Sequence, residues 1–134
     1  MIKPFAQYPL GISQSEEKKT NVFKLPISQA VFVPSTRKGQ VKIPESQFRS
    51  RIREVKIYLA KTFGGYTEIK GSGGYVGNSG NLIKEKIVKV VSFSTEHAYV
   101  KNKNRLVKKL RSWCKEWGQE SIGYEKEGDM YYIS

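Results

Sequence analysis

One carboxylate lies among apolar residues in a segment with strand character. In "NLIKEKIVKVVSF", residues 81–93, alternate side chains share a face, so Glu85 lies on the same face as Ile83 and Ile87. A carboxylate with such neighbours must be paired, hydrogen-bonded or protonated, and carboxylates tuned in this way can act as general bases. Glu85 is therefore a candidate for ligand chemistry in a sheet pocket. The alternative is a structural ion pair with an arginine, for which Arg37 is the best choice.

Three further residues could complete a pocket around Glu85. Tyr75 belongs to the glycine-rich stretch before this strand, and Gln119 and Glu120 lead into the last part of the chain. A pocket between the sheet and the glycine-rich loop would suit an enzyme or a small-ligand binder. No cofactor is indicated by any motif.

Nucleophilic and metal chemistry have few candidate residues. The chain has one cysteine, Cys114, and one histidine, His97, which are too few for a zinc site and for a Cys-His set placed with any certainty. Cys114 follows Trp113 in an apolar helix face, so a core thiol is predicted. A metal site is not predicted.

The glycine-rich stretch "TFGGYTEIKGSGGYVGNSGNL", residues 62–82, does not fit a phosphate-binding loop. Such a loop needs a strand before its glycines and a helix directly after them, so that the helix N-terminus faces the phosphate. Here "GSGGYVG" lies between two predicted strands. We expect a flexible hairpin tip that turns the chain; the alternative is a mobile loop that closes on a ligand through Tyr75.

Positive charge is the strongest compositional signal. Twenty-four basic side chains against twelve acidic ones give a formal net charge of +12, which opposes compaction unless an anionic partner is often present. One arc of the second predicted helix carries five cations that could follow a phosphate backbone. They are Lys101, Arg105, Lys108, Arg111 and Lys115, and we expect Arg37, Arg49 and Arg53 to support them.

This charge favours a non-enzymatic nucleic-acid-binding module, for RNA or DNA, as an accessory factor or small subunit of a nucleoprotein assembly. Two alternatives stay open. The first is an inhibitor or adaptor that docks on an acidic protein surface, and the second is the small-ligand binder or enzyme that uses Glu85. A homo-oligomer is also left open, because sheets of the expected class often pair through a face or an edge.

The elements that must position these residues follow from apolar periodicity. A strand is expected at 29–35, and a helix from Pro44 to the stop at Gly64 and Gly65, with an inward stripe of Phe48, Ile52, Val55, Leu59 and Phe63. A hairpin follows, with strands at 66–71 and 81–93. The second helix begins between Thr95 and Asn104 and ends at Gly118, and a final strand and a short strand at 130–133 close the chain.

This order predicts a ferredoxin-like α+β domain, β-α-β-β-α-β, with an antiparallel sheet, both helices on one face and a C-terminal hairpin. The length of 134 residues suits a single domain, which we place at 29–134 after an extended or disordered arm at 1–28. No apolar run is long enough to cross a membrane, and no signal segment is recognised. The lone cysteine excludes an intramolecular disulfide, and a cytoplasmic protein is expected.

Several short motifs resemble those of a poorly characterised group of small bacterial, plasmid and phage proteins. The shared pattern is F-G-G-x-T, a glycine-and-aromatic turn, an inward Glu on the next strand, and W-G-Q-E-[SA] before the last strand. Here these match Phe63 to Thr67, Gly73 to Tyr75, Glu85, and Trp117 to Ser121. The resemblance covers about residues 30–134. It implies a shared fold and no assigned activity.

Overall fold

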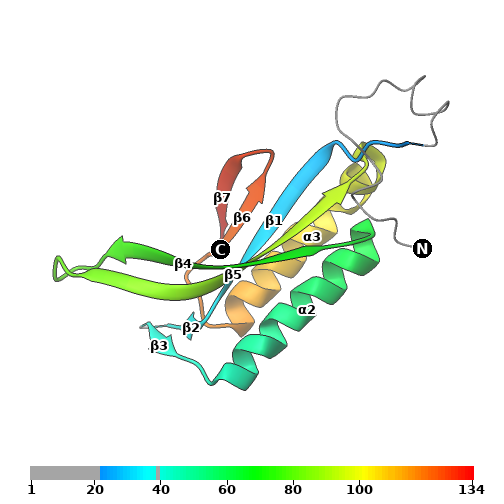
Figure 1. Ribbon diagram of the computed structural model, residues 1–134. Coiled ribbons are helices and arrows are strands. Elements are labelled where there is room, and N and C mark those ends of the chain that lie inside the picture. The colour runs from blue at the N-terminus through cyan, green and yellow to red at the C-terminus, as the bar shows by residue number, and fades with distance from the viewer. Residues whose placement is uncertain (1–21, 39) are drawn as a thin grey trace.

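The computed structural model describes residues 22–38 and 40–134 (Figure 1). Its elements are, in chain order, β1 (Ile27–Pro34), β2 (Thr36–Arg37), β3 (Val41–Lys42), α2 (Glu45–Phe63), β4 (Thr67–Val76), β5 (Leu82–Ser94), α3 (Glu96–Glu116), β6 (Ile122–Lys126) and β7 (Asp129–Ile133). Most of the expected arm at 1–28 lies outside the described residues. Its last two residues belong to β1.

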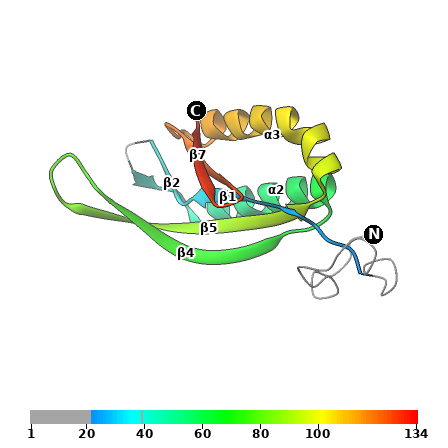
Figure 2. The same cartoon turned by 90° about the horizontal axis from the view of Figure 1, so that it is seen from above.

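Five strands form one antiparallel sheet in the order β4-β5-β1-β6-β7. Without β7, this is the strand order of a ferredoxin-like fold, and β7 extends it as the outer strand of the C-terminal hairpin. Helices α2 and α3 lie together on one face of the sheet (Figure 2). The predicted fold class is therefore confirmed. Between β1 and α2, the short strands β2 and β3 pair with each other in a separate ribbon.

The core lies between the helices and the sheet. All five residues of the predicted α2 stripe are buried, and they meet Leu106, Leu110 and Trp113 of α3 and the inward valines of β1 and β5. The burial of this apolar surface is the main stabilising contribution to the fold. In the described part of the chain, no helix is long and apolar enough to cross a membrane.

Local chemistry sets the ends of both helices. Gly64 takes the left-handed conformation (φ 107°) that a helix C-cap requires, and its N–H donates to the Ala60 carbonyl at 2.9 Å. Helix α3 begins at Glu96, because the Thr95 hydroxyl accepts a hydrogen bond of 3.1 Å from the backbone N–H of Ala98. This N-cap fixes the helix start at the early end of the predicted range.

The β4–β5 hairpin differs from the sequence prediction. β4 continues through Gly71, Gly73 and Gly74 to Val76, so these glycines are strand residues paired with β5 rather than part of a long connection. The turn is only 77–81, and the Gly77 N–H donates to the Asn81 carbonyl at 2.9 Å. Strand pairing uses backbone groups alone, so the glycines do not interrupt it. The result is a two-stranded arm that projects beyond the helices (Figures 1 and 2).

Candidate functional site

A cavity of about 870 Å³ lies where the projecting arm meets β1, the β2–β3 ribbon and the segment between α3 and β6; we call it the hairpin cavity. The four residues proposed from the sequence for a sheet pocket, Tyr75, Glu85, Gln119 and Glu120, all line it. They come from three separate parts of the chain, and the fold brings them together. Their role in ligand binding stays a prediction.

Glu85 is half-buried on the face of β5 turned away from the helices. Its Oε1 accepts a hydrogen bond of 2.7 Å from the Thr36 hydroxyl. Its partner on β4 is Gly73, which has no side chain to cover the carboxylate. In the described residues, Glu85 forms no ion pair with Arg37. Its negative charge instead favours the protonated form of Arg51 and so opposes the lowering of that guanidinium's pKa by burial.

Arg51 is a residue that sequence reasoning missed. Its side chain is only 7% exposed, and its guanidinium donates to three carbonyls: Nη1 to Pro34 and Thr36, both at 2.8 Å, and Nη2 to Trp117 at 3.2 Å. The guanidinium carbon also lies 5.3 Å from the centre of the Trp117 ring. Arg51 therefore ties together the end of β1, the start of β2 and the end of α3, which border the hairpin cavity.

The electrostatic environment of Arg51 has opposing components. Burial lowers the pKa of its guanidinium, and the carboxylates of Glu85 and Glu116 oppose that shift. A signal for this residue was present in the sequence: position 51 lies three residues after Phe48 and four before Val55, on the inward stripe of α2. A buried arginine at such a position must satisfy its donors within the protein.

Gln119 supports the same region. Its Nε2 donates to the Thr36 carbonyl at 2.7 Å and to the Trp117 carbonyl at 3.1 Å. Its own carbonyl accepts from the Cys114 thiol at 3.2 Å. Cys114 is buried, as expected for a core thiol, and burial raises the pKa of its thiol. The side-chain amide of Gln119 is thus engaged with backbone carbonyls. Of these two neighbouring residues, Glu120 is the one whose exposed side chain on the cavity wall can contact a ligand.

The hairpin cavity combines three kinds of chemistry. Glu85 and Glu120 provide negative charge, and Arg37 and Lys38 provide positive charge. Aromatic surface comes from Phe32, Tyr75 and Tyr132. Such a lining suits a small ligand that carries both signs of charge and a planar ring.

The predicted nucleic-acid-binding residues do not line a single cavity. Arg37 lines the hairpin cavity, whereas Arg49 and Arg53 line a second cavity beside α2. Neither cavity is lined by the five cations of α3, Lys101, Arg105, Lys108, Arg111 and Lys115, which are all exposed on the outer face of that helix.

No family model matches this chain, and no curated protein matches it. Among solved structures, the chain is similar to a phage SAM (S-adenosylmethionine) lyase. One of these structures is a complex with S-methyl-5'-thioadenosine (16% identity, TM-score 0.56), and another is the apo state (18% identity, TM-score 0.55). Each match covers 81% of this chain and 88% of the lyase chain. At this level of identity, the similarity shows a shared fold.

The prediction of a non-enzymatic nucleic-acid-binding module, and of RNA binding in particular, is wrong. The two solved structures reported above share the fold, and they are of an enzyme that acts on a small molecule. The physical reason for the error is that net charge does not specify a partner. The α3 cations lie on an outward face, where water can solvate them without any polyanion. Docking on an acidic protein surface and self-association stay predictions.

Proposed function

We propose that this chain is an enzyme that binds an adenosine-bearing sulfonium compound, S-adenosylmethionine, in the hairpin cavity and cleaves it to release S-methyl-5'-thioadenosine. The observation that carries the proposal is the Glu85 carboxylate, held by Thr36 and uncovered by Gly73, at the wall of a cavity large enough for such a ligand. The shared fold with the phage lyase supports the proposal.

The parts of the ligand match the parts of the cavity. S-adenosylmethionine carries a sulfonium and an ammonium, which Glu85 and Glu120 would attract, and a carboxylate, which Arg37 would bind through its forked donors. Its adenine is a planar ring that can stack on Tyr75, whose side chain is 45% exposed at the cavity wall. Both charge signs and the ring are therefore accommodated by residues of one cavity.

The reaction does not require the protein to protonate the leaving group. When the bond between sulfur and the amino-acid carbon breaks, its electron pair stays on sulfur, and the sulfonium becomes a neutral thioether without protonation. We therefore propose that the Glu85 carboxylate binds the cationic part of the substrate and so holds the reacting carbon in place. We assign no general acid. Analysis of the four-carbon product distinguishes two routes. Elimination gives an unsaturated amino acid and needs a base, which Glu85 can supply, to take the proton from the carbon next to the one that leaves sulfur. Internal attack by the substrate carboxylate gives a lactone and releases no proton.

The test is to incubate the purified protein with S-adenosylmethionine and to follow S-methyl-5'-thioadenosine by chromatography. Glu85→Gln keeps the shape of the side chain and removes its charge, and we expect it to lower kcat/KM by about 100-fold. Glu96→Gln, an equal charge change on an exposed residue of α3, is the matched control and is expected to leave the rate unchanged. Absence of turnover by the unmodified protein, or full activity of Glu85→Gln, would contradict the proposal.

A further inference from the structure

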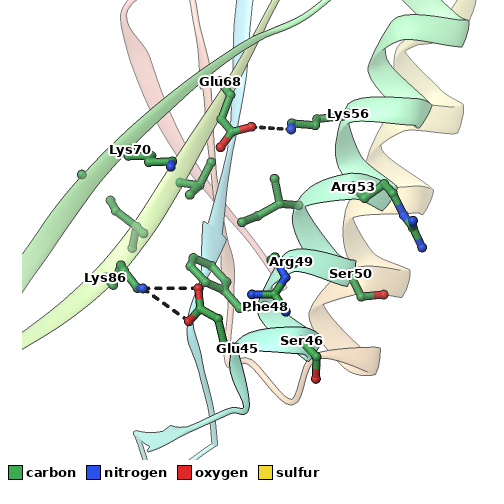
Figure 3. A pocket seen from close by; sticks show the side chains of 14 residues that line it. Glu45, Ser46, Phe48, Arg49, Ser50, Arg53, Lys56, Glu68, Lys70 and Lys86 are labelled. Atoms are coloured by element: carbon green, nitrogen blue, oxygen red, sulfur yellow. Dashed lines mark hydrogen bonds and ion pairs between the residues drawn. The ribbon is translucent and has the colours of Figure 1, made fainter.

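A second cavity, of about 750 Å³, lies between α2 and the strands β4 and β5; we call it the α2 groove (Figure 3). Two ion pairs join its walls. Lys56 of α2 pairs with Glu68 of β4, and Lys86 of β5 pairs with Glu45 of α2, with Nζ and Oε2 separated by 3.4 Å. The groove is therefore bridged at two points along its length.

Unpaired positive charge remains between these bridges. The cations that line the groove are Arg49, Arg53 and Lys56 of α2, Lys70 of β4 and Lys86 of β5, and its only carboxylates are those of Glu45 and Glu68. Both carboxylates are already engaged, so within the described residues Arg49, Arg53 and Lys70 have no ion pair. Figure 3 shows Arg49 and Lys70 extending into the groove from opposite walls, whereas Arg53 points away from the strands.

Arg49, Arg53 and Lys70 are exposed, so water solvates them when the groove is empty. Arg49 and Arg53 are four residues apart on one helix face, a spacing at which like charges repel each other. An anion between Arg49 and Lys70 would offset that repulsion. It would also find the hydroxyls of Ser46 and Ser50 on the same wall.

The floor of the groove is apolar. Phe48, Ile52 and Val88 line it, and all three belong to the buried core. These side chains are only 3%, 8% and 3% exposed, so the floor offers a narrow apolar strip. A ligand with a planar or apolar body could contact this strip while its anionic end meets the cations. Among anionic groups, a phosphate suits this arrangement best, because it presents two charges and several oxygens to an arginine fork and a facing lysine.

We propose that the α2 groove is a second ligand site, which binds a small phosphorylated organic molecule of the size of a nucleoside monophosphate. The linings of the α2 groove and of the hairpin cavity share only Ile87, and the hairpin cavity presents Glu85 and Glu120 where the α2 groove presents unpaired cations. The proposal therefore does not rest on the function assigned to the hairpin cavity.

The experiment is a titration of the full chain, at low ionic strength, with adenosine 5'-monophosphate and separately with inorganic phosphate, followed by two-dimensional NMR of the backbone amides. We expect saturable shifts at α2 residues 45–56 and at Lys70, with the nucleotide binding about threefold tighter than inorganic phosphate because only the nucleotide also contacts the narrow apolar floor. Arg49→Ala with Lys70→Ala should weaken nucleotide binding by about tenfold or more. Glu45→Gln releases Lys86 and should tighten it by about threefold.

The matched control is Lys108→Ala with Arg111→Ala, which removes the same net charge from the outer face of α3 and should change the affinity by less than about twofold. Equal weakening in both double variants would show general charge attraction and would overturn the site. So would shifts at the hairpin cavity instead of α2, since the nucleotide would then be occupying the other site through its adenosine. Equal affinity for nucleotide and inorganic phosphate would overturn the role of the apolar floor, and an absence of shifts would overturn the proposal as a whole.

Discussion

The Thr36 hydroxyl donates a hydrogen bond of 2.7 Å to Oε1 of Glu85, which joins the β2–β3 ribbon to the long strand β5. Thr36 is itself held in place, because its carbonyl accepts from Arg51 at 2.8 Å and from Gln119 at 2.7 Å. The orientation of one carboxylate at the hairpin cavity thus depends on residues of β2, α2 and the segment after α3. This arrangement anchors one side of the cavity wall by hydrogen bonds.

Replacement of Thr36 by valine tests this arrangement. The substitution keeps the shape of the side chain and removes the donor, so the Glu85 carboxylate loses its anchor and we expect kcat/KM for S-adenosylmethionine to fall by about tenfold. Steady-state kinetics measures the change. Thr67→Val, at an exposed position of β4, is the control and should have no effect. Full activity of Thr36→Val would show that the hydrogen bond does not position Glu85 for the reaction.

Arg51 is expected to be the most sensitive charged residue for stability. Lysine at this position cannot reach three carbonyls with a forked group, so Arg51→Lys should lower the free energy of unfolding by about 3 kcal/mol. Chemical denaturation followed by tryptophan fluorescence provides the measurement, because Trp113 and Trp117 are both buried in the core. The exposed Arg53→Lys should change the stability by less than about 0.5 kcal/mol. Similar values for the two variants would disprove the structural role of Arg51.

Tyr75 is expected to contribute to ligand affinity and not to stability. Its side chain is 45% exposed at the hairpin cavity, so Tyr75→Ala removes little packing but eliminates a stacking surface. The affinity for S-methyl-5'-thioadenosine, measured by calorimetry, should fall by about tenfold. Tyr66 has a similar exposure of 42% and does not line the cavity, which makes Tyr66→Ala the matched control. A loss of affinity in both variants, or in neither, would argue against a stacking role.

The helices and the core could be predicted from the sequence because they depend on local periodicity. The stripe from Phe48 to Phe63 repeats at helical spacing, and Gly64 marks its end by a conformation that other residues rarely adopt. The extent of β4 could not be predicted, since Gly71, Gly73 and Gly74 join a strand only because β5 offers its backbone groups. Glycine content alone favoured a loop.

The candidate site could be predicted in part. Glu85 was recognisable by its apolar neighbours, and Tyr75, Gln119 and Glu120 by their places in the expected order of elements. Arg51 was not recognised, because it donates its hydrogen bonds to carbonyls of residues that are 15 to 66 positions away in the chain. The basic face of α3 led to a wrong function, since charge on an outward helix face describes how the residues are solvated and not which partner they bind.

Cys114 should make stability depend on pH in the alkaline range. Burial raises the pKa of its thiol in the folded state, so the folded protein keeps a proton at pH values where an unfolded thiol, with a pKa of about 8.5, has lost it. The folded state then binds more protons than the unfolded state. The contribution of Cys114 to the free energy of unfolding is therefore complete below the unfolded pKa and is lost as pH rises through the folded pKa.

The test compares the unmodified protein with Cys114→Ser, which cannot ionise in this range and still has a donor for the Gln119 carbonyl. Between about pH 7 and pH 9.5, the unmodified protein should therefore lose more of its free energy of unfolding than Cys114→Ser. Urea denaturation at both pH values measures this difference. Staying below pH 10 limits a similar contribution from Tyr124, because burial raises its pKa in the folded state while in the unfolded state it ionises near about pH 10. Parallel pH dependences for the two proteins would show that the thiol is not a source of the alkaline destabilisation.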